Sequence, residues 1–206
     1  MTEAIQQGLV RGTLHRATGA TSAIVLSHGA GSNSNAKIMV ALAEAFAAAG
    51  IDALRIDLPF RRARSGGSPH PSTSGRDREG IVEAARLFSG YSRVYLGGHS
   101  YGGRQSSMVA AEQPDLAGAL LLLSYPLHPP GKAAQLRTAH FPNLRTPVLF
   151  VHGTRDPFGT PDEMREALAL IPARNELYLI EKAGHELKPV TTDPSEVVQR
   201  FGISAT

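Results

Sequence analysis

The sequence has no cysteine and no tryptophan among its 206 residues. The absence of cysteine excludes disulfide bonds, metal sites built from thiolates and a cysteine nucleophile. Aromatic residues make up only 6% of the chain, which leaves few rings on which nucleic-acid bases could stack. Serine is therefore the strongest nucleophile that remains available for covalent catalysis.

Long apolar runs and a strong excess of one charge are missing as well. No stretch approaches the ~18 consecutive apolar residues of a membrane span, and residues 1–7 lack the features of a signal peptide. The formal net charge of +3 is small, and the basic residues are scattered. We therefore expect a cytoplasmic protein that binds a small molecule and neither nucleic acid nor membrane. The sequence leaves its oligomeric state open.

Apolar runs of strand length alternate along the chain with amphipathic segments of helical length. Strands are predicted at residues 9–15, 23–27, 53–58, 93–97, 116–124, 147–152 and 176–180. Helices are predicted at residues 36–49, 76–89, 101–113 and 161–171, with a last helix opened by Asp193 and Pro194. Segment 9–15 is expected at the edge of the sheet, and segment 59–75 is expected to be a polar loop outside the core.

This alternation predicts an α/β fold, with a single domain over residues 1–206 and a mostly parallel sheet covered by helices on both faces. The connection between the strands at 116–124 and 147–152 is about 20 residues long, too short for a separate cap domain. Ligands of such sheets bind beyond the carboxyl ends of the strands. We expect a shallow, open site at that edge.

A glycine-flanked serine, in Gly98-His99-Ser100-Tyr101-Gly102, connects the predicted strand at 93–97 to the helix that follows. A nucleophilic serine on a tight strand-to-helix turn stands clear of its own backbone, and the glycines allow this strained, closely packed turn. The N–H groups at the helix N-terminus can stabilise negative charge in a transition state. The pentapeptide is weak evidence alone, so its meaning depends on an acid, a histidine and further N–H donors.

An acid and a histidine follow the serine, each just past one of the last two predicted strands. In this type of site the nucleophile is followed along the chain by Asp or Glu and then by His. No acidic residue lies between Asp115 and Asp156, so Asp156 is the predicted acid, with a helix or turn cap as the alternative role. His185 would take the proton of Ser100 while Asp156 fixes the histidine tautomer and stabilises the imidazolium.

A second loop of small residues, His28-Gly29-Ala30-Gly31, follows the predicted strand at 23–27. The N–H of Ala30, with Gly29 or Gly31 as alternatives, is predicted to form an oxyanion hole with the N–H of Tyr101. His28 is expected to brace this turn by a hydrogen bond. The eight histidines show no spacing typical of a metal site, so we expect neither a metal nor another cofactor.

Five segments carry a resemblance to a known family. They are His28-Gly29-Ala30-Gly31, Gly98-His99-Ser100-Tyr101-Gly102-Gly103, Tyr125-Pro126-Leu127-His128-Pro129-Pro130-Gly131-Lys132, Gly153-Thr154-Arg155-Asp156-Pro157-Phe158-Gly159 and Gly184-His185-Glu186-Leu187-Lys188-Pro189. The chain resembles the α/β-hydrolase superfamily over nearly its whole length, and in particular its small, cap-less, dienelactone-hydrolase-like family. That family includes a mammalian testis-expressed protein and a subunit of a nuclear histone acetyltransferase complex. The resemblance implies a triad of Ser100, Asp156 and His185 and a generic hydrolase activity.

Two classes of function fit these residues. The first is a serine hydrolase of the carboxylesterase or thioesterase type, which cleaves a small or exposed ester or thioester through an acyl-enzyme on Ser100. The second is a protein-interaction module that keeps the fold with weak or no catalysis. The joint presence of serine, acid, histidine and a small donor loop favours the enzyme. Amide hydrolysis and acyl transfer would use the same residues.

Three arginines, Arg61, Arg62 and Arg64, lie in the loop after the predicted strand at 53–58, on the side of the sheet expected for Ser100. Arg61 and Arg62, together with Gly29, are candidates for binding the substrate. One guanidinium at the mouth of the site would pair with a carboxylate or phosphate on that substrate. The alternative is a solvated basic loop with no part in recognition.

Overall fold

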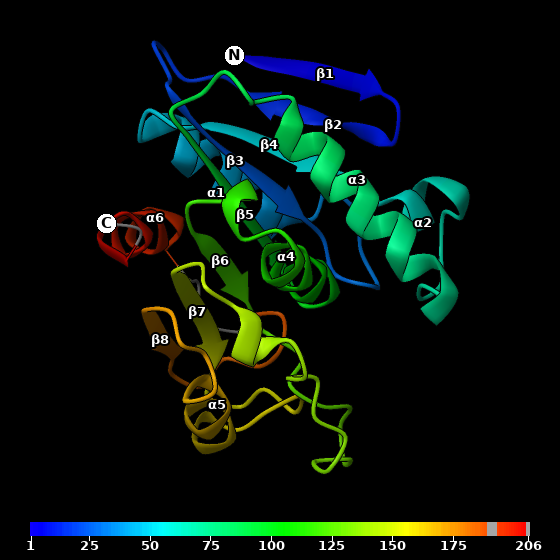
Figure 1. The fold of residues 1–206 in the computed structure, drawn as a ribbon, viewed down its shortest axis with the longest axis vertical. Coiled ribbons are helices and arrows are strands. Elements are labelled where there is room, and N and C mark those ends of the chain that lie inside the picture. The colour runs from blue at the N-terminus through cyan, green and yellow to red at the C-terminus, as the bar shows by residue number, and fades with distance from the viewer. Residues whose placement is uncertain (189–192, 205–206) are drawn as a thin grey trace.

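An eight-stranded sheet forms the centre of the molecule in a computed structural model that describes residues 1–188 and 193–204 (Figure 1). Pro189, the end of the last family-like segment, lies outside the described residues. The strands are β1 (Thr2–Gln7), β2 (Val10–His15), β3 (Ser22–Ser27), β4 (Asp52–Ile56), β5 (Arg93–His99), β6 (Leu120–Leu123), β7 (Val148–Gly153) and β8 (Asn175–Ile180). Their order is β1-β2-β4-β3-β5-β6-β7-β8, in which β3 to β8 are parallel and β1 and β2 are antiparallel additions at one edge.

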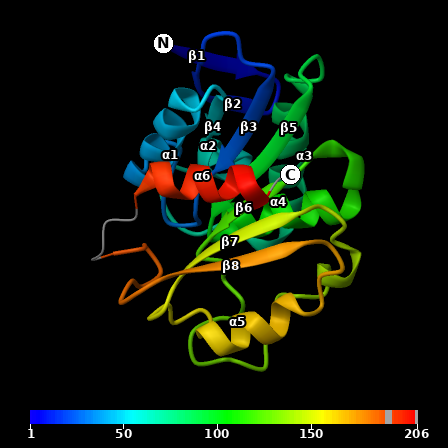
Figure 2. The same ribbon diagram turned by 90° about the vertical axis from the view of Figure 1, so that its left-hand side faces the viewer.

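Helices cover both faces of this sheet, as predicted. They are α1 (Lys37–Ala48), α2 (Pro59–Ala63), α3 (Ser74–Arg86), α4 (Tyr101–Glu112), α5 (Pro161–Leu168) and α6 (Pro194–Ser204), with short 3-10 turns η1 (Pro71–Thr73), η2 (Pro114–Leu116) and η3 (Phe141–Asn143). Helices α1 and α6 lie on the same face of the sheet (Figure 2) and share one core, in which the rings of Phe46 and Phe201 meet edge to face. Ile81 of α3, Val109 of α4 and Met164 of α5 belong to the core on the opposite face.

The central strand β6 shows why its sequence is apolar without interruption. Leu120 and Leu122 belong to the core on the α3 and α4 side, whereas Leu121 and Leu123 belong to the core on the α1 and α6 side. Successive side chains of a strand point to opposite faces, so a strand covered on both faces needs an apolar residue at every position. All four leucines are fully buried, and burial of one such side chain stabilises the fold by roughly 1.5–3 kcal/mol.

The strand predicted at the sheet edge lies one position further in. β2 pairs with β4 on one side and with β1 on the other, so β1 forms the edge. β1 is mostly polar and exposed, and it joins the sheet through a hairpin that turns at Gly8, where φ is +54°. The edge prediction for residues 9–15 is wrong because backbone pairing, which needs no apolar pattern, adds β1 to the sheet.

Segment 59–75 is not the wholly exposed loop that its polar composition predicts. It contains α2, in which Pro59, Phe60 and Arg61 are buried. The ring of Phe60 packs edge to face on Tyr101, with centroids 5.5 Å apart. The guanidinium of Arg61 donates to backbone carbonyls. A charged side chain whose donors all find acceptors can be buried where composition alone predicts exposure.

The carboxyl ends of β5, β7 and β8 lead into residues predicted to be functional. Ser100 follows β5 directly, Asp156 lies just past β7, and His185 lies just past β8. Because these strands are parallel, their ends meet at one edge of the sheet. The connection from β6 to β7 contains only the turn η3 and forms no cap domain. Within the described ranges, every helix is too short or too polar to cross a membrane.

Candidate active site

Ser100 occupies a strained turn between β5 and α4. Its backbone has φ +51° and ψ −116°, a conformation that residues with side chains rarely adopt. Close backbone packing requires the glycines on both sides. A Cβ at Gly98 would lie 2.5 Å from the carbonyl oxygen of Ser27, and one at Gly102 would lie 2.5 Å from that of His28. The turn therefore holds the Ser100 side chain at the N-terminus of α4.

Ser100, His185 and Asp156 form one hydrogen-bonded chain. Nε2 of His185 lies 2.8 Å from Oγ of Ser100, and Nδ1 lies 2.8 Å and 3.0 Å from the two carboxylate oxygens of Asp156. An ionised carboxylate only accepts hydrogen bonds, so Nδ1 of His185 carries the proton and Nε2 accepts the Ser100 hydroxyl hydrogen. The Asp156 carboxylate is fully buried, whereas 16% of the His185 side chain is exposed, so solvent reaches the chain from the histidine end.

The loop after β7 holds the Asp156 carboxylate in place. The N–H of Phe158 donates to Oδ1 at 2.9 Å. The buried His152 donates from Nε2 to the carbonyl of Gly159 at 2.8 Å, so its unprotonated Nδ1 faces Asp156 at 3.8 Å. Burial lowers the pKa of His152, which keeps the ring neutral and leaves His185 as the partner of the carboxylate. The ring of Phe158 covers His185, with centroids 4.1 Å apart.

His28 fixes the loop that carries Ala30. The N–H of Leu58 donates to Nε2 of His28 at 3.1 Å, so Nδ1 carries the proton and donates to the Gly29 carbonyl at 2.8 Å. Burial lowers the pKa of His28, which favours this neutral form. The C=O and N–H of a trans peptide point in opposite directions, so this bond directs the Ala30 N–H away from His28. The bracing hydrogen bond predicted for His28 is confirmed.

The two N–H groups predicted to form an oxyanion hole are both free of acceptors within the described part of the chain. They belong to Ala30 and Tyr101, which line the same cavity as Ser100. Tyr101 is the first residue of α4, where helical N–H groups have no intrahelical partner. Its hydroxyl donates to the buried Asp77 at 2.7 Å, and burial together with this bond raises the pKa of the phenol. The side chain of Tyr101 is thus anchored, while its N–H remains free at the start of α4.

Arg61 binds the loop that carries Ala30 and does not line the cavity at Ser100. Its guanidinium donates to the carbonyl oxygens of Ala30 at 2.6 Å and Ser32 at 2.8 Å, and also to that of Gly67 at 3.0 Å. Only 6% of the residue is exposed, and it does not line the cavity at Ser100. Its donors are therefore committed to the protein's own backbone.

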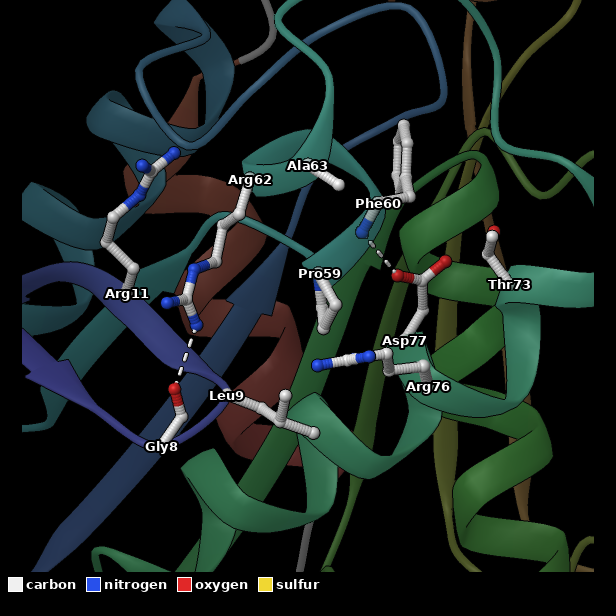
Figure 3. Close-up of a pocket in the computed structure, with 10 residues that line it drawn as sticks. All are labelled: Gly8, Leu9, Arg11, Pro59, Phe60, Arg62, Ala63, Thr73, Arg76 and Asp77. Atoms are coloured by element: carbon white, nitrogen blue, oxygen red, sulfur yellow. Dashed lines mark hydrogen bonds between the residues drawn. The ribbon is translucent and has the colours of Figure 1, made fainter.

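A cavity of about 530 Å³ lies away from Ser100, against the β1–β2 turn, α2 and α3 (Figure 3). Arg62 points into it and donates to the carbonyl of Gly8 at 3.0 Å. Asp77 lies at its wall and accepts a hydrogen bond from the N–H of Phe60 at 2.9 Å. Because its lining includes no member of the Ser100 chain, we place the candidate active site elsewhere although this cavity is slightly larger.

The cavity at Ser100 has a volume of about 510 Å³. Its wall includes Phe158 and two arginines, Arg104 and Arg137, to which the sequence analysis did not point. Arg104 lies on the first turn of α4, and its N–H donates to the carbonyl of Ser100 at 3.0 Å, so its closeness in sequence to Ser100 could have indicated it. Arg137 comes from the proline-rich connection between β6 and β7, whose path the sequence does not predict.

The family of the chain follows from a match that spans most of its length. Residues 20–202 match the model of a family described as "Alpha/beta hydrolase domain", so the chain belongs to that family. It forms a single α/β-hydrolase domain, and the predicted fold class is confirmed.

Solved structures share this fold over nearly the whole chain. A dienelactone hydrolase from Anabaena variabilis is 21% identical, with a TM-score of 0.77 and coverage of 100% of this chain and 95% of that one. Est1E from Butyrivibrio proteoclasticus, with ferulic acid bound, is 18% identical, with a TM-score of 0.75 and coverage of 94% and 96%. XC6422 from Xanthomonas campestris, a serine hydrolase without a lid, is 15% identical, with a TM-score of 0.70 and coverage of 98% and 90%. At these identities the likeness concerns the fold.

Proposed function

We propose that the protein is a serine hydrolase that cleaves small or exposed esters or thioesters. The observation that carries this proposal is the hydrogen-bonded chain from Ser100 through His185 to Asp156, whose two shortest contacts are both 2.8 Å. A serine on a strained turn, an oriented imidazole and a buried carboxylate are the three parts that nucleophilic catalysis by serine requires.

The proposed reaction has two half-reactions. Oγ of Ser100 attacks the carbonyl carbon while its proton passes to Nε2 of His185, and Asp156 stays ionised to stabilise the imidazolium. The C–O or C–S bond then breaks, the leaving alcohol or thiol takes the proton from His185, and the acyl group remains on Ser100. Water next gives a proton to His185 and attacks the acyl-enzyme, which releases the acid and restores the Ser100 hydroxyl.

The N–H groups of Ala30 and Tyr101 would stabilise the oxyanion that forms in each half-reaction. Loss of one such donor raises the barrier by about 3 kcal/mol, so their placement matters as much as a side chain would. His28 holds the carbonyl before the Ala30 N–H, and Arg61 holds the carbonyl after it. Both peptide planes beside this donor are therefore fixed before a substrate binds, which supports a preorganised oxyanion hole.

The shape of the site supports small or exposed acyl groups. The domain has no cap that would close over a long acyl chain bound at the cavity of about 510 Å³. Two structural neighbours have names that agree with this reading, one a dienelactone hydrolase and the other a serine hydrolase without a lid. Esters and thioesters place the same demands on these residues, so a panel of substrates has to separate them.

Labelling with a fluorophosphonate tests the proposal. Wild-type protein should be labelled and Ser100→Ala should not. Ser124→Ala is the matched control, because Ser124 also has a positive φ (47°) and follows the neighbouring strand β6, yet its buried Oγ has no partner among the described residues. This variant should be labelled like the wild type.

Two outcomes of the labelling would contradict the proposal and favour a protein-interaction module. One is labelling that persists in Ser100→Ala. The other is a wild-type protein that resists the probe under conditions that label a known hydrolase. A panel of p-nitrophenyl esters and matched thioesters of increasing acyl length would then define the preferred substrate of an active protein.

A further inference from the structure

Two arginines from different segments line the cavity at Ser100. Arg104 lies on α4, and Arg137 lies in the connection between β6 and β7. The other residues of the wall are Ala, Ser, Pro, His, Tyr and Phe, so the lining contains no carboxylate. The cavity therefore combines a candidate nucleophile with two positive charges and no negative one.

Arg104 has no charged partner in the part of the chain that the structure describes. Its Nε is buried and lacks a hydrogen-bond acceptor among these residues. Burial and the charge of Arg104 lower the pKa of His140 to about 4, so that ring is neutral at neutral pH. Burial also raises the pKa of the nearby Tyr125 hydroxyl, which stays protonated. The surroundings of Arg104 thus supply no negative charge.

Arg137 brings a second guanidinium to the same place. Burial, and then the positive charge of Arg104, lower the pKa of Arg137. One side-chain nitrogen of Arg137 donates to the carbonyl of Pro126 at 3.3 Å, and its own carbonyl accepts the Tyr125 hydroxyl at 2.7 Å. The backbone is anchored, and the other guanidinium N–H groups have no acceptor in the described ranges.

Arg104 and Arg137 lack the carboxylate partner that five other arginines of the described structure have. Arginine-carboxylate pairs are formed by Arg11 with Asp57, Arg16 with Glu3 and Asp52, Arg78 with Glu112, Arg165 with Asp162, and Arg200 with Glu176 and Glu196. Two like charges held together in a partly buried cavity repel each other, and a bound anion would relieve that repulsion. The arrangement therefore favours an anionic ligand.

We propose that Arg104 and Arg137 bind a carboxylate of the substrate, so that the preferred substrate is a short ester or thioester with a free carboxylate. This inference rests on the proposed hydrolase function of Ser100. Ser100 and Arg104 line the same cavity, and the N–H of Arg104 donates to the Ser100 carbonyl at 3.0 Å, so a carboxylate bound there would be separated from the scissile carbonyl by a short spacing. The planar guanidinium fork matches a carboxylate in two parallel hydrogen bonds. A half-ester of a short dicarboxylic acid, such as glutaric acid, has this spacing.

Substrate discrimination tests the subsite directly. The measured quantity is the ratio of kcat/KM for monomethyl glutarate to kcat/KM for methyl pentanoate, a neutral ester with the same number of acyl carbons. The wild type should favour the acidic ester by about tenfold or more, and Arg104→Gln and Arg137→Gln should each lower the ratio by about tenfold. Added salt should lower the wild-type ratio, because an exposed part of the charge interaction is screened.

Arg93→Gln is the matched control. It removes the same charge from an exposed residue at the start of β5, at the opposite end of the strand from Ser100, and should leave the ratio unchanged. An equal loss in all three variants would show a long-range charge effect and overturn the subsite. A ratio that stays at the wild-type value in both cavity variants would overturn it as well.

Binding without turnover separates this inference from the proposed function. Ser100→Ala protein should bind glutarate in calorimetry, and adding Arg137→Gln should weaken binding by about tenfold. Arg137→Lys, which keeps the charge but lacks the planar fork, should bind glutarate with an affinity between those of the Ser100→Ala protein and the variant that also carries Arg137→Gln.

Glutarate binding with no labelling of the wild type would overturn the hydrolase proposal and leave the carboxylate site standing. Hydrolysis of neutral esters without glutarate binding would overturn the subsite, as would tighter binding of inorganic phosphate than of glutarate.

Discussion

Nε2 of His99 lies 2.9 Å from the carbonyl oxygen of His185. Burial lowers the pKa of His99, so its neutral ring donates this hydrogen bond. On the other side of the ring, Nδ1 lies 2.9 Å from the position that a Cβ on Gly29 would occupy. One side chain thus contacts both loops that flank Ser100, the donor loop and the loop that carries the histidine.

His99→Ala should lower kcat by about 10-fold to 100-fold with a smaller change in KM, because the His185 loop loses an anchor and small misplacements of catalytic groups slow the reaction. His99→Gln, whose amide can donate to the same carbonyl, should retain more activity than His99→Ala. Steady-state kinetics with a neutral ester provides the measurement. An alanine variant within about twofold of the wild type would show that the loop is held by other contacts.

Gly29→Ala should impair catalysis more than stability. The new methyl group would lie 2.9 Å from Nδ1 of His99 and 3.5 Å from Cβ of Ser100, so the donor loop or the His99 ring must shift. Displacement of one oxyanion donor raises the barrier by about 3 kcal/mol, which corresponds to roughly 100-fold in kcat. Gly31→Ala is the control in the same loop, since no atom lies within 4 Å of its added methyl group. Equal kcat values for the two variants would contradict this account.

Asp156→Asn should leave the fold intact and lower kcat by about 10⁴-fold, the loss known for the corresponding change in a serine protease. An amide can present its NH₂ group to Nδ1 of His185, which would favour the tautomer that cannot accept the Ser100 proton. Thermal unfolding should show a folded variant, and burst kinetics should show slow acylation. Activity within a few-fold of the wild type would assign the acid to a different residue.

His140 should make the protein less stable in mild acid. Burial, and then the charge of Arg104, lower its folded-state pKa to about 4, whereas an unfolded histidine titrates near about 6.5. Below about pH 6.5 the unfolded chain binds a proton that the folded protein does not, so stability falls as the pH drops toward about 4. At pH 5 this group should cost about 2 kcal/mol. Between pH 7 and pH 5, denaturant unfolding of His140→Gln should therefore lose about 2 kcal/mol less stability than the wild type.

The central sheet could be predicted because burial on both faces leaves a clear apolar signal, as at Leu120–Leu123. The edge strand Thr2–Gln7 could not, since five of its six residues are exposed and only Ile5 packs on the core. The burial of Phe60 and Arg61 could not be predicted from the sequence either. For Arg61 this burial depends on backbone acceptors about 30 residues earlier in the chain, the carbonyls of Ala30 and Ser32.

The candidate site divides in the same way. The positions of Ser100, Asp156 and His185 could be predicted, because parallel strands bring their carboxyl ends to one edge and chain order limits the choice of acid. The arginines that line the cavity at Ser100 could not be predicted. The sequence favours the arginines of one loop, Arg61 and Arg62, whereas Arg104 and Arg137 are far apart in sequence and line one cavity only in the folded protein.

The hairpin of β1 and β2 precedes the family-matched residues 20–202 and covers a vulnerable edge. All five residues of β4 are buried, so without β2 this strand would present unpaired N–H and C=O groups along a ribbon that includes the charged Asp52 and Arg55. Such a ribbon is a template for pairing with strands of other molecules. We therefore expect the polar, solvent-exposed β1 to protect this edge from pairing with other molecules. A chain that begins at residue 17 would keep the whole candidate site and still form aggregates through β4.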